Sequence, residues 1–313
     1  MHGPIPAVVR QLRLESDTVV SVELERVDGA PLPAWAPGAH IDLRLPNGHV
    51  RQYSLCGPRT PGANYRIGVL REEASSGGSE YVHTFLRPGQ RVGIGAVRNH
   101  FELQPAPHHV FIAGGIGITP IYAMIDSLAA DASWHLYYAG RSRRTMAFAD
   151  ELEARFPDRV TVATDDSGRF LDLDAILAEA PPGTAVHSCG PRGLLDALTE
   201  LAPARPHVTV HTERFAATDK GDLVNTEHVL HCRRSDRKID VPADKPFLVA
   251  LREAGLHVES SCANGLCGTC EVRVLEGTPD HRDDILSGPA RDRTDVMYVC
   301  VSRAVDRDIV LDL

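Results

Sequence analysis

Residues 261–270 read SCANGLCGTC. This stretch contains three of the four cysteines that decide the fold of the C-terminal part of the chain. They are Cys262, Cys267, Cys270 and, some thirty residues later, Cys300. The spacing Cys-x4-Cys-x2-Cys with a distant fourth cysteine is a ligand pattern of [2Fe-2S] clusters. Gly265 and Gly268 let the backbone approach the sulfurs, so N–H groups can point at the cluster's negative charge. The sequence therefore predicts a [2Fe-2S] site with two thiolates for each iron, three ligands on one loop and the fourth from the next strand.

A structural zinc site also uses four cysteines, but usually as two separated pairs of short spacing. The grouping here is three plus one, which favours iron and sulfur over zinc. The stretch resembles plant-type ferredoxins, and that resemblance implies an α+β β-grasp fold for residues 227–313. Within it we expect a hairpin over 227–241, a helix over 246–254 and strands over 271–275 and 309–313.

The preceding segment, residues 105–217, alternates strand-like and helix-like stretches. The expected strands lie at 109–113, 134–139, 160–163, 185–188 and 207–211, and the expected helices at 118–130, 148–156, 173–180 and 192–201. Such alternation predicts an α/β domain with a parallel sheet covered on both faces. Residues 218–226 are small, polar and glycine-containing, which is typical of a linker.

Two turns of this α/β segment lie between a strand and a helix. The first reads GGIGITP at residues 114–120, and the second reads CGP at residues 189–191. Glycines allow a tight turn, and the N–H groups at the start of the following helix can bind a pyrophosphate. The first turn is not the G-x-G-x-x-G fingerprint, so the motif alone does not identify a dinucleotide site.

The first third, residues 1–104, contains short alternating runs separated by turn signals such as Asn47-Gly48 and Pro88-Gly89. This pattern predicts an antiparallel β-barrel or sandwich. The string RQYSL at residues 51–55 follows a short strand and the Asn47-Gly48 turn. Its arginine can neutralise a phosphate, its tyrosine ring can cover a flavin, and its serine can donate to the flavin ring edge. A second stretch, GGSEYVH at residues 77–83, offers backbone N–H groups to an anion, and Ser79 fits the N-cap of a helix.

RQYSL followed by GGSEYVH resembles the ferredoxin reductase superfamily, and most of all the phthalate dioxygenase reductase family. That family carries FMN and has its ferredoxin domain at the C-terminus, as here, so the resemblance spans essentially the whole chain. It implies a flavin-binding antiparallel β-barrel domain at 1–104 and an NAD(H)-binding domain at 105–217. It also implies flavin contacts from Arg51, Tyr53, Ser54, Leu55, Gly77, Gly78 and Ser79.

The same resemblance places the nicotinamide and its linker against the two glycine turns, with Thr119 beside the flavin. The residues carried over are Gly115, Gly117, Thr119, Cys189, Gly190 and Pro191. Arg141 and Ser142 are expected near the adenosine ribose, and Phe215 is expected to cover the flavin from the nicotinamide side. The family favours NADH, whereas Arg141, Arg143 and Arg144 would also suit the 2′-phosphate of NADPH. The choice between FMN and FAD also stays open, with FMN favoured.

A nicotinamide gives two electrons as hydride, and a [2Fe-2S] cluster accepts one at a time, so a flavin must lie between them. The resemblance implies that the electrons pass to a terminal Rieske oxygenase, O-demethylase or cytochrome P450. No amino-acid general acid or base is required, since the cofactors carry the chemistry. A standalone flavin oxidase or ferric reductase, or a ferredoxin-like carrier without enzyme activity, is the alternative.

The charge balance excludes two kinds of partner. The net charge is −9, which disfavours nucleic acid and anionic membranes as partners.

No stretch approaches the ~20 apolar residues of a membrane span, and residues 1–12 do not have the pattern of a secretory signal. With seven cysteines, an odd number, a disulfide framework is not expected. We therefore expect a cytoplasmic protein.

Overall fold

The computed structural model describes residues 3–57, 64–73, 77–216, 223–286 and 288–313. The chain divides into two compact units, Met1–Arg214 and Phe215–Leu313, and each is described by itself. Most of the expected linker, residues 218–222, lies outside the described residues. Within the described residues, no helix combines the length and the apolar character that crossing a membrane requires.

The first half of unit 1 is an antiparallel barrel of six strands in the order β4-β3-β6-β1-β2-β5. An isolated antiparallel bridge between Leu55 and Ile67 joins the two end strands. Alternate strand residues, among them Ile41, Leu43 and Ile94, point into the barrel and are fully buried. The elements are β1 (Ile5–Ser16), β2 (Val19–Arg26), β3 (His40–Arg44), β4 (Val50–Ser54), β5 (Tyr65–Leu70), α1 (Gly78–Thr84) and β6 (Arg91–Arg98).

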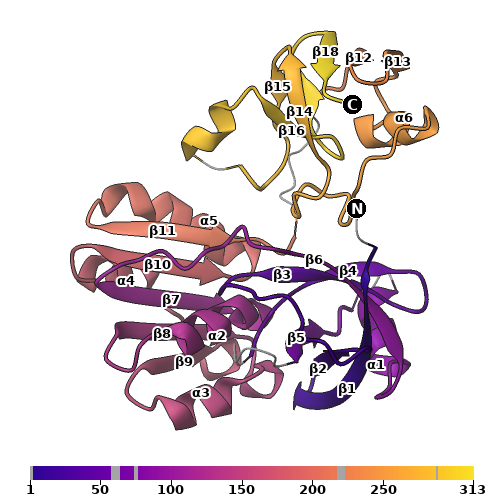
Figure 1. Cartoon of the computed structure of the whole chain (residues 1–313). Helices are drawn as coiled ribbons and strands as arrows, with labels where there is room; N and C mark the ends of the chain where they lie inside the picture. Colours follow the sequence, from indigo (N-terminus) through magenta and orange to yellow (C-terminus); the bar gives the residue numbers. More distant parts are fainter. Residues whose placement is uncertain (1–2, 58–63, 74–76, 217–222, 287) are drawn as a thin grey trace. The chain divides into compact units, whose positions relative to one another are not determined.

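The second half of unit 1 is a five-stranded parallel sheet in the order β11-β10-β7-β8-β9. Its strands are β7 (His108–Gly114), β8 (Ser133–Gly140), β9 (Val160–Thr164), β10 (Thr184–Cys189) and β11 (Val208–Glu213). Its helices are α2 (Ile118–Ser127), α3 (Ala149–Arg155), α4 (Leu173–Glu179) and α5 (Arg192–Leu201). Figure 1 shows these helices flanking the sheet. Parallel strands need such helical crossovers, which leave both faces of the sheet apolar.

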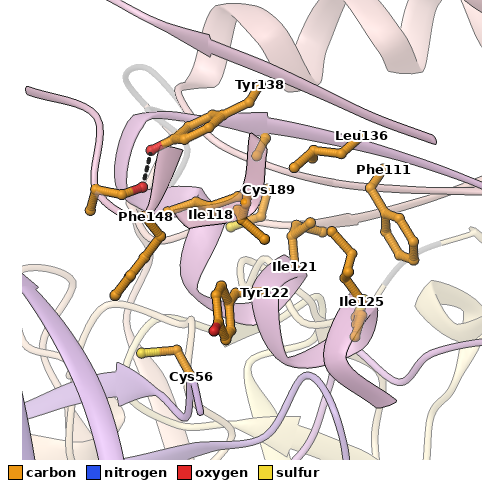
Figure 2. Close-up of a cluster of buried hydrophobic side chains, with 14 of the residues drawn as sticks. Cys56, Phe111, Ile118, Ile121, Tyr122, Ile125, Leu136, Tyr138, Phe148 and Cys189 are labelled. Carbon is orange, nitrogen blue, oxygen red and sulfur yellow. Dashed lines mark hydrogen bonds between the residues drawn. The ribbon is translucent and has the colours of Figure 1, made fainter. Parts of the chain in front are cut away.

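Two apolar clusters confirm that both faces are covered. One contains Phe111 and Leu136 of the sheet with residues of α2 and α3. The other contains Val110 and Val186 of the sheet with residues of α4 and α5. The first cluster continues into the barrel half of unit 1, where Cys56 is fully buried. Figure 2 shows its side chain beside that of Tyr122 on α2.

Unit 2 is a mixed five-stranded sheet in the order β13-β12-β18-β14-β16, packed against one helix. Strands β12 and β18 are parallel, and the other neighbours are antiparallel. Phe247 and Leu251 of the helix are fully buried against this sheet. The elements are β12 (His228–Cys232), β13 (Arg237–Val241), α6 (Phe247–Glu253), β14 (Glu271–Glu276), β15 (Pro279–Asp280), β16 (Val296–Tyr298), β17 (Arg303–Ala304) and β18 (Asp308–Leu311).

The expected fold classes are confirmed in all three parts of the chain. Every strand and helix expected within residues 105–313 has a counterpart, usually within two or three residues at each end. The sequence did not predict β1 or the short strands β15, β16 and β17. It was also wrong about Cys300, which lies in the turn after β16 rather than on a strand.

Candidate functional site

The four cysteines predicted as cluster ligands, all in unit 2, are brought together as two pairs. The thiols of Cys262 and Cys267 interact directly, and so do those of Cys270 and Cys300. Cys267 and Cys270, one from each pair, also lie close enough to interact electrostatically. Three of the four are buried, and Cys262 is partly exposed. The loop and the turn after β16 therefore hold four sulfurs in one place, with the Cys262 side toward solvent.

The backbone of the loop is bent so that its N–H groups face sulfur. The N–H groups of Asn264 and Leu266 donate to Sγ of Cys262 at 3.3 and 3.4 Å, and that of Thr269 donates to Sγ of Cys267 at 3.4 Å. Such bends need positive φ, and the loop has three residues of that kind, Ala263 (55°), Gly265 (72°) and Gly268 (74°). At Gly265 a side chain is also excluded by space, because a Cβ would lie 2.7 Å from Val301. The donors stabilise negative charge on the thiolates.

The pairing fits two irons better than one zinc. Two irons need two thiolates each, and the four cysteines interact as two pairs. The pKa of Cys267 is lowered by its hydrogen bond with Cys262, which favours the thiolate that metals bind. The donor set therefore fits a [2Fe-2S] cluster.

In unit 1, the two glycine turns meet at the carboxyl ends of β7 and β10. These strands are neighbours, although β8 and β9 lie between them in sequence. The chain leaves β7 toward one side of the sheet and β10 toward the other, so the two strands form the topological switch point. Open α/β sheets bind their ligands outside the carboxyl ends of strands at such a point.

The two turns pack backbone against backbone. A Cβ on Gly117 would lie 2.1 Å from the carbonyl oxygen of Cys189, and one on Gly114 would lie 2.4 Å from Cδ of Pro191. A Cβ on Gly190 would lie 2.9 Å from Cα of Gly114. Gly115 has a φ of 53° and nothing within 4 Å of its missing Cβ. Three glycines are thus required for the turns to meet, and the fourth is required by its backbone conformation.

The first turn also contacts the barrel. Thr119 is 2 % exposed, and its hydroxyl donates to the carbonyl of Ile116 at 3.0 Å. Its methyl group lies against Gly68 of β5, where a Cβ would be 2.7 Å away. The barrel therefore reaches the switch point at Thr119, the position expected beside the flavin.

The expected flavin residues lie on β4 and at the start of α1. A Cβ on Gly78 would be 2.6 Å from Cγ of Arg51, so the arginine and the glycine turn are adjacent. Burial raises the pKa of Tyr53 to about 12, so its phenol stays neutral. Ser54 is 5 % exposed, and its hydroxyl has no hydrogen-bond partner within the described part of the chain. An unsatisfied buried hydroxyl fits a position that meets a polar ring edge.

Two details of this region differ from expectation or add to it. Ser79 is not the N-cap of α1, because Gly77 takes that position with a φ of 94°. The Ser79 hydroxyl instead accepts from the N–H of Glu72 at 3.3 Å. Leu55 is fully buried in the barrel core, so its side chain is structural.

The three arginines after β8 have different surroundings. Arg143 pairs with Asp150 and Glu153 on α3. Arg144 pairs with Asp17 at 2.9 Å. Arg141 is exposed, and its carbonyl accepts from the N–H of Asp166 at 3.1 Å, which brings that acidic residue close. The hydroxyl of Ser142 contacts that of Thr145 at 3.4 Å.

Glu213 is the residue of this site that the sequence did not identify. It ends β11 and is paired in register with Cys189 on β10. Its Oε2 is buried without a hydrogen-bond partner among the described residues, and burial raises its pKa to about 8. Glu213 belongs to no sequence motif. Its position at the end of the last strand of the parallel sheet is the only signal that could have identified it from the sequence. Phe215, expected over the flavin, is the first residue of unit 2 and is 43 % exposed.

These features together define a pyridine-nucleotide-dependent flavin reductase with its own [2Fe-2S] domain. Residues 230–305 match the family model of the 2Fe-2S iron-sulfur cluster binding domain. Residues 96–206 match that of the N-terminal domain of dimethylamine monooxygenase subunit DmmA-like proteins.

Similar proteins cover the whole chain. The phenoxybenzoate dioxygenase subunit beta of Ectopseudomonas oleovorans is 40% identical over 99% of this chain and 98% of its own length. The vanillate O-demethylase oxidoreductase of Pseudomonas putida is 38% identical over 99% of this chain and 100% of its own. The crystal structure of phthalate dioxygenase reductase matches with a TM-score of 0.73 and 34% identity over 99% of this chain and 98% of that one.

An intact type IV self-sufficient cytochrome P450 monooxygenase matches with a TM-score of 0.92 and 38% identity. The match covers 99% of this chain but 41% of that one, so this chain spans about two fifths of the larger protein. The chain belongs to the phthalate dioxygenase reductase family, as the resemblance predicted, and it is an oxidoreductase.

Proposed function

We propose that this chain is the NADH-dependent reductase component of an oxygenase system. It takes hydride from NADH onto FMN and passes the electrons one at a time through the [2Fe-2S] cluster to a terminal Rieske oxygenase, O-demethylase or cytochrome P450. The observation that carries the proposal is the meeting of the two glycine turns with Gly68 of the barrel, in a chain that also holds two thiol pairs. Relatives named as oxygenase components support the partner class.

The cofactors would supply the redox chemistry, and the residues position them. Arg51 and the turn at Gly77 and Gly78 would bind the flavin phosphate, Tyr53 would cover the ring, and Ser54 would meet its edge. The turns at 114–120 and 189–191 would hold the nicotinamide and its linker, with Arg141 and Ser142 near the adenosine ribose. The cluster would take Cys262 with Cys267 and Cys270 with Cys300 as its ligand pairs.

The preference for NADH over NADPH is supported by the arginines near the expected ribose site. Carboxylates already neutralise Arg143 and Arg144, and Asp166 lies next to Arg141. A 2′-phosphate needs an unpaired cation, and an acidic neighbour would repel it. The ribose hydroxyls of NADH carry no such charge.

We further propose three domains at 1–104, 105–217 and 227–313, joined by a linker at 218–226, in a cytoplasmic protein. The free state of all seven cysteines supports that compartment. An aromatic cover from Phe215 on the nicotinamide side of the flavin also remains a proposal.

One experiment tests the proposal. The purified holoprotein is heated to release its flavin, which is identified by chromatography, and its visible spectrum is recorded before and after NADH and NADPH. We expect FMN, an iron-sulfur spectrum that bleaches with NADH, and slow oxygen consumption without a partner. Colourless protein from iron-replete cells would contradict the proposal, and rapid oxygen consumption without a partner would indicate a standalone oxidase instead.

A further inference from the structure

Arg66 of β5 lies where the barrel half of unit 1 meets the sheet half. Its guanidinium carbon is 4.9 Å from the centroid of the Tyr122 ring and 5.2 Å from that of the Phe148 ring. The two ring centroids are 5.3 Å apart. A guanidinium over the face of an aromatic ring is attracted by the ring's electrons, most strongly where water is excluded. Tyr122 is 4 % exposed and Phe148 is 3 % exposed, so the contact lies away from water.

The same arginine is bonded to the chain segment that follows the expected flavin residues of β4. Arg66 Nε donates to the carbonyl oxygen of Cys56 at 2.5 Å, and the N–H of Cys56 donates to the carbonyl oxygen of Arg66 at 2.8 Å. Cys56 comes two residues after Ser54, the last residue of β4. A Cβ on Gly57 would lie 3.1 Å from Cβ of Arg66 and 3.2 Å from its Nε. The arginine side chain is therefore fixed closely along this stretch of backbone.

The two aromatic rings belong to the elements beside the first glycine turn. Tyr122 lies on α2, three residues after Thr119, so the two side chains are neighbours on one face of the helix. The methyl group of Thr119 lies against Gly68 of β5, and Cε2 of Phe148 lies 3.8 Å from the position of a Cβ on that glycine. Figure 2 shows Phe148, Tyr122 and Cys56 gathered at this contact. The arginine thus touches both the segment after β4 and the helix that begins at the glycine turn.

The two rings are held in place by their own surroundings. Phe148 is the N-cap of α3 and has a φ of 61°, a left-handed conformation that residues other than glycine seldom adopt. Such a conformation persists only where the surrounding structure imposes it. The hydroxyl of Tyr122 donates to Glu151 at 2.6 Å and accepts from Nη1 of Arg155 at 2.8 Å. Rings fixed in this way give the guanidinium one defined place between the two halves of unit 1.

We propose that Arg66 is a positioning residue that sets how the nicotinamide lies against the flavin. The inference rests on the proposed function, in which Ser54 meets the flavin edge and Thr119 lies beside the ring. Flavin and nucleotide are bound by different halves of unit 1, so the distance between them depends on the contacts that join the halves. Hydride transfer is sensitive to that distance, since a displacement of about 1 Å can cost about 100-fold in rate. Binding of either ligand alone does not require the contact.

The test separates hydride transfer from binding in the flavin-loaded protein. Anaerobic stopped-flow bleaching of the flavin at increasing NADH gives the limiting rate of reduction and the Kd for NADH. Long-wavelength charge-transfer absorbance of the stacked flavin and nicotinamide reports how well the two rings overlap. We expect Arg66→Met, which keeps an apolar stem and removes the charge, to lower the limiting rate at least about ten-fold and to weaken this absorbance. The Kd for NADH should change by less than about three-fold, because the nucleotide turns are untouched.

Arg159 supplies a matched control. Its guanidinium carbon lies 5.4 Å from the centroid of the Trp134 ring, and its Nη1 donates to the carbonyl oxygen of Ala132 at 2.9 Å. These are the same two kinds of contact, made within the sheet half alone, so Arg159→Met should keep the wild-type rate and absorbance. A wild-type rate and absorbance in Arg66→Met, or an equal loss in Arg159→Met, would overturn the proposal. Wild-type protein that binds no flavin or is not reduced by NADH would instead overturn the proposed function.

Variants on both sides of the contact keep the test decisive where Arg66→Met does not retain flavin. Arg66→Lys keeps the charge, but an ammonium is not planar and has no Nε to donate to Cys56, so reduction should still be at least about five-fold slower than in wild type. Tyr122→Leu removes one ring and should slow reduction to a similar extent. The double variant Arg66→Lys and Tyr122→Leu should be no slower than the slower single variant, because both changes weaken the same contact. Wild-type rates in the two single variants, or losses that multiply in the double variant, would contradict the role of Arg66.

Discussion

The Cα of Gly117 faces the carbonyl of Cys189 so closely that a Cβ at this glycine would lie 2.1 Å from the carbonyl oxygen. Gly117 follows β7, and Cys189 ends β10, so the contact joins the two turns at the topological switch point of the sheet. Any side chain larger than hydrogen must push one turn away from the other. The space into which the nicotinamide is proposed to bind therefore depends on this close approach, together with those at Gly114 and Gly190.

Gly117→Ala should separate the turns and slow reduction of the flavin by NADH. We expect a loss of about 1–3 kcal/mol in unfolding free energy, which is typical of overpacking, and a larger effect on hydride transfer than on flavin binding. Stopped-flow bleaching of the flavin and thermal denaturation measure the two effects. Gly193→Ala is the matched control, because nothing lies within 4 Å of its missing Cβ. Equal rates in the two variants would show that the contact does not position the nicotinamide.

The sequence predicted the parallel sheet because its strands are short apolar runs that alternate with helix-length segments, and only local pattern is needed for that. It predicted which four cysteines would come together, because three of them lie on one loop with the spacing of a [2Fe-2S] site. It did not predict Glu213 or the contact of Thr119 with Gly68. Those features depend on which strands become neighbours in the sheet and on which segments pack over the strands. A short stretch of sequence does not determine either property.

Glu213→Gln should make stability less dependent on pH. In the folded protein burial raises the pKa of Glu213 from 4.5 to about 8, so the folded state binds more protons than the unfolded state between these values. The stability linked to this group is present below pH 4.5 and is lost as the pH rises toward 8. The effect is on the order of a few kcal/mol. Thermal denaturation at pH 6 and pH 8 should show a larger fall for wild type than for the variant, and parallel curves would refute the linkage.

Removing the two carboxylates that hold Arg143 should improve the use of NADPH. In the double variant Asp150→Ala and Glu153→Ala, the Arg143 guanidinium is freed to bind a 2′-phosphate. We expect the KM for NADPH to fall about ten-fold, as expected for one charge-assisted hydrogen bond, while the KM for NADH changes little. Asp126→Ala is the control, because it removes one ion pair of Arg155 on α3 and leaves both ion pairs of Arg143 in place. An unchanged KM for NADPH would mean that the ribose does not approach Arg143.

Cys267→Ser should abolish electron transfer that requires the cluster and spare transfer that does not. The thiol of Cys267 pairs with that of Cys262, so its loss leaves one iron with a single thiolate. Cytochrome c reduction, which we expect to require the cluster, should fall to background, and the iron-sulfur absorption should disappear. Reduction of ferricyanide, which takes electrons from flavin directly, should continue at nearly the wild-type rate, because all the proposed flavin and nucleotide residues except Phe215 lie in the other unit. Cys232→Ala, which removes a buried thiol of the same unit outside the loop, is the control and should keep both activities. If Cys267→Ser retained both rates, electrons would not need the cluster, and the proposed order from nucleotide to flavin to cluster would be wrong.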